Sequence, residues 1–202
     1  MDPLVLVALA ATGAWLLNGQ QQRRRIALLS QHLAPYQIER LLETLTQGYL
    51  RAMGEPGDER RAQVLANLVA SEEQLCGQFE RFVAAFARVP AEQARVSRLP
   101  IGLPLLLQVL PGASFDLRDL LSVHARGIAR AVRNDDSLPP RERAFTMTAE
   151  LLLMQHSCHW YCKSRAVASA RMLARHQTPH AQLLASVSPT TRAEYLALTG
   201  LR

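Results

Sequence analysis

Apolar side chains recur at intervals of three and four residues along most of this chain, which is the spacing of one buried helix face. Between residues 35 and 53 this pattern is carried by Ile38, Leu41, Leu42, Leu45 and Tyr49. Pro35 suits the first turn of a helix, and Gly54 follows the last periodic residue. The pattern predicts an amphipathic helix that buries one face.

The same period continues beyond the loop GEPGD, with proline or polar loops at the stops. Asp58 is placed to cap a long helix that runs to about Val89, where Pro90 ends it. Ser114 is placed to cap a further helix that runs to about Arg133, before the loop NDDSLPP. No segment alternates strictly enough to predict a strand.

The segment 141–176 contains neither glycine nor proline and is predicted to form one uninterrupted helix. Thr-Pro and Ser-Pro pairs follow at 178–179 and 188–189, and each supplies a cap and a first-turn proline. Two short helices are therefore expected within 178–200. The fold class predicted is all-α, a single multi-helix bundle domain.

The N-terminus differs from the rest of the chain. Residues 3–17 (PLVLVALAATGAWLL) form an uncharged apolar run. As a helix this run is about 22 Å long, and with residue 1 and the uncharged residues 18–22 it can just cross a hydrocarbon layer about 30 Å thick. We predict a transmembrane anchor helix in residues 1–22; a buried core helix of a soluble protein is the alternative.

Charge around this run predicts its orientation. Asp2 precedes it, whereas Arg23, Arg24 and Arg25 follow it, which is the reverse of a cleaved signal peptide. Cationic flanks stay on the cytoplasmic side, so the N-terminus is expected outside and residues 23–202 form a cytoplasmic domain. Trp15 suits the membrane interface. The location expected is an inner membrane of bacterial type, with a single span.

The segment 99–111 (LPIGLPLLLQVLP) is apolar and interrupted by proline. We predict a short buried helix near 103–110. Contact of this segment with the membrane surface is the alternative, because an anchored domain lies close to lipid.

Composition adds two constraints. Of the 202 residues, 49% are hydrophobic and 20% charged, which is typical of a globular domain. Three cysteines, an odd number, make a poor disulfide framework and favour a reducing compartment, in agreement with a cytoplasmic domain.

The octapeptide QHSCHWYC (155–162) lies inside the predicted helix 141–176. Glu150, Ser157, Ser164 and Arg171 are spaced seven apart and share one stripe, which we predict to face solvent. Cys158 and Cys162 point to the opposite side and are predicted to be core residues. As an alternative, Cys158, His159 and Cys162 are weak candidates for a metal or haem site, which would need further ligands from another helix. No metal or cofactor is expected.

Catalytic motifs are missing from the sequence. It contains no glycine-rich phosphate loop, GxSxG, HExxH or paired CxxC, and its carboxylates, among them Glu72 and Asp116, are expected at caps, on exposed faces or in loops. We assign no catalytic residues and do not expect an enzyme, although one assembled from dispersed residues would escape this reasoning.

Positive charge gathers in the C-terminal third, where residues 151–193 contain no acidic side chain. Two sets could join into one basic patch if the fold brings them together: Arg126, Arg130 and Arg133, and Lys163, Arg165, Arg171 and Arg175. An anionic membrane surface is the partner that the anchor favours. Nucleic acid is disfavoured, because the arginines lack interleaved aromatic residues.

These observations predict a membrane-tethered helical adaptor, assembly or regulatory protein that acts through contacts with a protein partner. One alternative is a helical protein that binds a metal, haem or small ligand through the Cys158, His159 and Cys162 region. A second is a basic regulator that binds nucleic acid. Whether a small molecule binds stays open.

Overall fold

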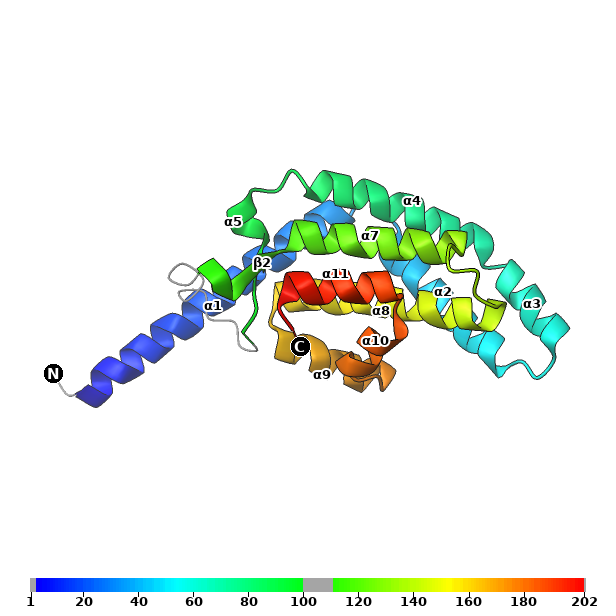
Figure 1. The fold of residues 1–202 in the computed structure, drawn as a ribbon. Helices are drawn as coiled ribbons and strands as arrows, with labels where there is room; N and C mark the ends of the chain where they lie inside the picture. The colour runs from blue at the N-terminus through cyan, green and yellow to red at the C-terminus, as the bar shows by residue number, and fades with distance from the viewer. Residues whose placement is uncertain (1–2, 100–110, 202) are drawn as a thin grey trace.

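The structure is a computed structural model that describes residues 3–99 and 111–201, and these residues are mainly helical (Figure 1). In chain order the helices are α1 (Pro3–Leu33), α2 (Ile38–Gly54), α3 (Asp58–Ala66), α4 (Val69–Phe86), α5 (Ala91–Ala94), α7 (Leu117–Arg133), α8 (Pro140–Cys162), α9 (Arg165–His176), α10 (His180–Ser186) and α11 (Pro189–Thr199). The all-α prediction is confirmed. The predicted helix at 103–110 lies outside the described residues.

Two strands of three residues were not predicted. β1 (Arg95–Ser97) pairs antiparallel with β2 (Ser114–Asp116), and Val96 lies opposite Phe115. Both of these apolar side chains are buried. A three-residue strand is too short to show alternation, which explains why the pattern did not reveal it.

The strand β2 also corrects the predicted start of the following helix. Ser114 does not cap α7, because it lies in the strand. The cap is Asp116, whose carboxylate accepts a hydrogen bond of 2.8 Å from the backbone N–H of Arg118. A one-turn 3-10 helix (Pro111–Ala113) precedes the strand.

Two predicted long helices are each broken in two. The predicted helix 58–89 divides between α3 and α4 at Asn67 and Leu68. The predicted helix 141–176 divides after Cys162, because the Ser164 hydroxyl accepts a hydrogen bond from the backbone N–H of Val167 and caps α9. A serine side chain that bonds to the backbone can end a helix even where the sequence contains no glycine or proline. The prediction relied on glycine and proline as stop signals, so it missed this break.

The helix α8 lies at the centre of the domain and contacts α1, α2, α7, α9 and α10. The predicted solvent stripe along it is wrong, since Glu150 and Ser157 are completely or almost completely buried. Cys158 and Cys162, predicted as core, are only partly buried. A helix that is enclosed by neighbours on several sides has no single solvent-exposed face. Polar residues spaced seven apart along such a helix therefore do not identify a solvent-exposed face.

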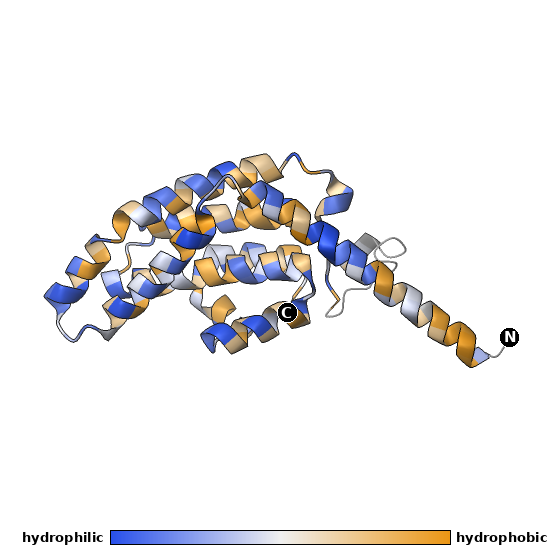
Figure 2. Ribbon diagram, turned by 180° about the vertical axis from the view of Figure 1, so that it is seen from behind, coloured by the Kyte–Doolittle hydropathy of each residue, from blue (hydrophilic) through white to orange (hydrophobic). Residues whose placement is uncertain are grey.

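Helix α1 has two halves with different surroundings. Its C-terminal half packs on the domain and buries Leu29, whereas its N-terminal half projects away from the other helices (Figure 1). Figure 2 shows that this projecting half is largely hydrophobic. Large apolar side chains there are exposed, for example Leu4 at 75% and Trp15 at 73%.

Among the described residues, α1 is the one helix long and apolar enough to cross a membrane, a property that signal sequences share. Its best window has a mean hydropathy of 1.3, and none of that window is buried in the described protein. The helix continues without a break through residues 22 and 23, where the sequence had suggested a boundary between anchor and domain.

The three arginines after the apolar run are not equivalent. Arg23 and Arg24 are exposed. Arg25 was predicted to flank the membrane, but its guanidinium donates hydrogen bonds to the carbonyl oxygens of Arg95 (2.8 Å) and Tyr161 (3.2 Å). The same group lies 5.3 Å from the centre of the Tyr161 ring. Arg25 therefore fixes α1 to the domain.

Candidate functional site: a groove beside helix α8

A groove of about 860 Å³ lies along α8. Helix α2 lines one side, α9 lines another, and the C-terminal half of α1 and two residues of α4 complete it. This volume is within the range of about 300–1,000 Å³ that is usual for small-molecule sites. The groove is therefore the main candidate site among the described residues.

The floor of the groove is apolar. Phe79 and Phe82 reach it from α4, Leu42 from α2, and Met154 and Cys158 from α8. These side chains belong to, or pack on, the hydrophobic core of the domain. The floor is consequently fixed by core packing, which leaves a preformed apolar surface at the base of the groove.

The rims of the groove carry opposite charges. Helix α9 contributes Arg171 and Arg175, and α2 contributes Glu39, Glu43 and the cation Arg40. All five side chains are exposed, and within the described part of the chain none of them forms an ion pair. Charged groups without an ion-pair partner are available to a ligand.

The residues proposed for a metal site also line the groove. Cys158, His159 and Cys162 all lie on its α8 side. Burial raises the pKa of the Cys158 thiol to about 12 and that of the Cys162 thiol to about 11, so both are protonated at neutral pH. Over residues 3–99 and 111–201, no group of three or more His, Cys, Asp or Glu side chains is arranged to hold a metal ion.

His159 adds a polar group at the edge of the groove. Burial lowers the pKa of its imidazole, and the nearby Arg171 and Arg175 lower it further. Its Nδ1 atom is buried and has no hydrogen-bond partner in the described structure.

The two sets of predicted basic residues occupy different surroundings. Lys163, Arg171 and Arg175 line the groove, whereas Arg165 lies 5.8 Å from the centre of the Trp160 ring. Lys163 also donates a hydrogen bond of 2.8 Å to the side chain of Gln22 on α1.

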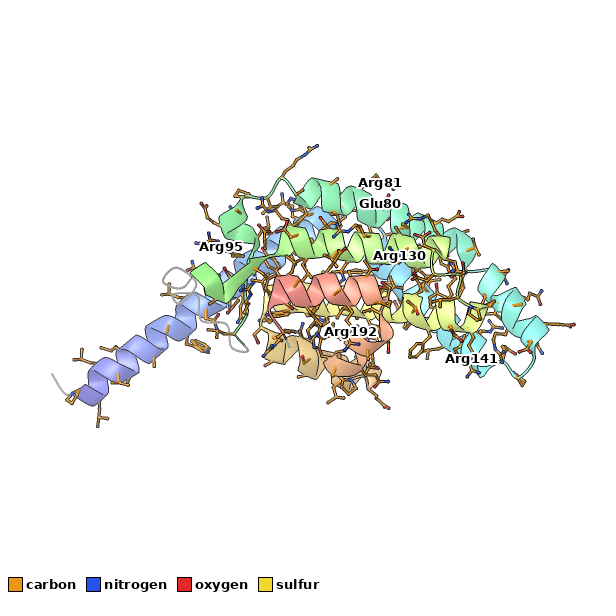
Figure 3. The ribbon with its side chains drawn as sticks, in the orientation of Figure 1. Glu80, Arg81, Arg95, Arg130, Arg141 and Arg192 are labelled. Atoms are coloured by element: carbon orange, nitrogen blue, oxygen red, sulfur yellow. The ribbon has the colours of Figure 1, made fainter. Side chains whose placement is uncertain are left out.

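The α7 set faces a separate depression with Glu80 and Glu194. Arg126 pairs with Glu194, Arg130 with Asp136 and Arg133 with Asp135, at 2.5, 3.2 and 2.8 Å. Glu80 and Arg130, which both line this depression, are labelled in Figure 3. Among residues 3–99 and 111–201, the α7 arginines thus have acidic partners and the α9 arginines have none.

A buried polar cluster, which the sequence did not predict, lies on the other side of α8. The His124 Nε2 atom is 2.8 Å from the Ser157 hydroxyl, and the His180 Nε2 atom is 3.1 Å from the Tyr195 hydroxyl. The ring of His156 stacks on that of His180 with centroids 4.3 Å apart. Burial lowers the pKa values of His124 and His156 to about 3 and that of His180 to about 4.

Glu150 lies in the same interior. Its Oε1 atom accepts a hydrogen bond of 3.1 Å from the backbone N–H of Ser188, and burial raises its pKa to about 7. The carboxyl lies against Gly127 of α7, where a Cβ atom would overlap both Glu150 and Thr191. The glycine permits this close approach between α7 and α8.

Glu72 was predicted to be solvated but is 1% exposed. It forms an ion pair with Arg143 and accepts a hydrogen bond of 2.5 Å from the Tyr49 hydroxyl. Arg143 also donates to the carbonyl oxygens of Ala131 (2.9 Å) and Val132 (3.0 Å). These contacts join α2, α4, α7 and α8, and they indicate a structural role.

Comparison of the chain with models of protein families, with curated proteins and with solved structures gives no match.

Proposed function

We propose that this chain is a membrane-tethered helical adaptor, assembly or regulatory protein whose cytoplasmic domain acts through contacts with other proteins. The observation that carries the proposal is the projecting N-terminal half of α1, whose apolar side chains lie outside the domain core.

The energetics favour lipid around this half. Transfer of a large apolar side chain from water to an apolar environment lowers the free energy by about 1.5–3 kcal/mol. Five of these apolar side chains are 50–75% exposed: Leu4, Val7, Leu9, Leu16 and Leu17. Their combined transfer free energy from water into a membrane is favourable by on the order of 10 kcal/mol.

Charge supports an orientation for the tether. Arg23 and Arg24 are exposed just after the apolar half, and a cationic flank stays in the cytoplasm. The N-terminus would lie outside and the domain inside, at an inner membrane of bacterial type. The exposed arginines could also contact anionic headgroups, at about 1 kcal/mol for each basic residue near the surface.

The tether is tested by cell fractionation of the full chain and of a full-length Leu6→Arg, Leu9→Arg variant. Both substituted positions are exposed, so the domain should fold in either chain. The unaltered chain is expected in the membrane fraction after an alkaline wash, and the variant in the soluble fraction. Recovery of the unaltered chain as soluble protein would contradict the tether.

The adaptor role is tested by photo-crosslinking in intact cells from single positions on the exposed surface, with Arg81, Arg141 and Arg192 as sites (Figure 3). Capture of the same protein from neighbouring sites is expected. Labelled chain that captures no protein from any site would exclude the role.

The groove favours a second function, the binding of a small ligand. It combines a preformed apolar floor with unpaired charged groups on its rims, next to Cys158, His159 and Cys162. Such a combination is the usual composition of a ligand site. This function is compatible with the adaptor role, since the groove occupies one side of the domain only.

A further inference from the structure

We propose that the groove binds one acyl chain of an anionic membrane lipid, with the lipid phosphate held by Arg171 and Arg175. The inference rests on the proposed tether, which would keep the groove beside a bilayer. It assigns the ligand class of the groove from its size, its charges and its position along α1.

The floor of the groove suits an alkyl chain. Phe82, Met154 and Cys158 present an apolar surface there. A helix with its side chains is about 10 Å wide, and an alkyl chain is narrower, so it can lie directly against this floor.

The groove is long enough for such a chain. Its α2 side extends from Ile38 to Leu50, and the 12 helical steps between these residues span about 18 Å. Apolar side chains recur along this length, so a chain lying against α2 would contact apolar surface over several turns. Removing the chain from water supplies the attraction.

The charges of the rims select the headgroup. Arg171 and Arg175 are one helical turn apart on α9, both exposed and both without a carboxylate partner in the described structure. Arginine side chains bind phosphate through paired hydrogen bonds. On the α2 side the charges of Glu39 and Glu43 outweigh that of Arg40, so the α9 side attracts an anion more strongly.

The groove begins close to the proposed membrane. Its first α1 residue is Ile26, nine residues after Leu17, the last apolar residue of the projecting half. Nine residues of helix span about 14 Å. Lys163 lies at the same end of the groove, where its ammonium group is bonded to Gln22 of α1. A lipid can therefore enter from the headgroup layer.

The experiment uses the full chain in phosphatidylcholine vesicles that contain a trace of a lipid with a photoactivatable diazirine in its acyl chain. The labelled lipid is either phosphatidate or phosphatidylcholine with the same chains. After illumination, crosslinked peptides are identified by mass spectrometry. Both lipids should label the apolar half of α1, and phosphatidate should label the groove peptides of α4 and α8 about tenfold more than phosphatidylcholine does.

Matched variants separate the site from general attraction to anionic lipid. The Arg171→Gln, Arg175→Gln double variant should lose most groove labelling by phosphatidate. The Arg81→Gln, Arg141→Gln double variant removes the same charge from exposed positions outside the groove (Figure 3). This control variant should retain groove labelling by phosphatidate. Thr46→Trp should reduce groove labelling by either lipid, and thermal unfolding establishes that each variant is folded.

Four outcomes would overturn the inference. If α1 is labelled and the groove is not, the tether stands and the lipid site is wrong. If both lipids label the groove equally, the selectivity for anionic lipid is wrong. If neither lipid labels α1, the tether fails and the lipid site fails with it. Crosslinking of groove positions to a protein in intact cells, with no lipid labelling, would instead assign the groove to a partner helix.

Discussion

The Nε2 atom of His124 on α7 lies 2.8 Å from the hydroxyl of Ser157 on α8, and both side chains are inaccessible to solvent. Burial keeps this imidazole neutral, with a pKa of about 3 against 6.5 for an ordinary histidine. His156 and His180 are neutral for the same reason. These three buried histidines therefore carry no charge at neutral pH.

Acid should destabilise the protein. The folded pKa values of His124, His156 and His180 are depressed, so their contribution to stability is present above pH 6.5 and is lost as the pH falls toward 4. Each histidine can cost about 1.4 kcal/mol per pH unit over this window. Urea unfolding at pH 7.5, 6 and 5 measures the loss.

The test substitution is His124→Gln, which removes one of these buried imidazoles and should weaken the acid dependence. A free energy of unfolding that is constant between pH 7.5 and 5 would contradict the account of the buried histidines.

Glu150→Gln should stabilise the protein at high pH. The folded pKa of Glu150 is raised from 4.5 to about 7, so the favourable neutral form is fully present below pH 4.5 and is lost as the pH rises through 7. Glutamine keeps an acceptor for the Ser188 N–H and carries no charge. The free energy of unfolding should rise by up to about 3 kcal/mol at pH 8 and change little at pH 4.5, as measured by chemical denaturation. Equal gains at both pH values would show that burial of charge is not the cause.

Arg143→Met should cost about 3–5 kcal/mol, because it leaves the buried Glu72 carboxylate without its cation. Arg141→Met, two residues away on the exposed side of α8, should change stability by less than about 0.5 kcal/mol. A double variant that adds Glu72→Gln to Arg143→Met should recover part of the loss. Thermal unfolding of the unaltered protein, the two single variants and the double variant tests the energetic coupling between Glu72 and Arg143. Similar losses of stability for Arg141→Met and Arg143→Met would refute it.

Gly127→Ala should destabilise the protein, because the new Cβ atom would overlap the Glu150 carboxyl and the Thr191 hydroxyl. Overpacking of this kind costs about 1–3 kcal/mol. Gly77→Ala on α4 is the matched control, since the nearest atom to its Cβ is 3.9 Å away on the Arg81 side chain. That substitution should stabilise the helix by about 0.5–1 kcal/mol. If both Gly127→Ala and Gly77→Ala lower the stability, the cause is an effect of the substitution on the helix backbone, and the overlap with Glu150 is not needed to explain it.

Periodicity predicted the helices where a single face is buried. In α2 the predicted apolar residues are all buried. Its ends differ slightly from the prediction, because Pro35 lies three residues before the helix begins and Gly54 is its last residue. The Ser-Pro pair at 188–189 likewise begins α11, where the Ser188 hydroxyl accepts a hydrogen bond from the Thr191 N–H. Such signals are local, so the sequence alone contains them.

The candidate site was predicted in part. The octapeptide 155–162 was recognised as unusual, and Cys158, His159 and Cys162 do line the groove. The groove itself was not predicted, because it depends on α9 folding back along α8 after the break at Ser164. The buried partners of Glu72 and Glu150 come from other helices and could not be predicted from the spacing along one.

Helix α1 continues from its apolar end into the domain over 31 residues, about 46 Å, and Arg25 clamps it there. In a bilayer, a change of thickness alters the tilt of such a helix. Because α1 is bonded to the domain through Arg25, the domain would rotate together with the helix, through the same angle as the change in tilt. Membrane thickness would thereby set the direction in which the domain presents its surfaces, a mechanical coupling that a flexible linker would abolish.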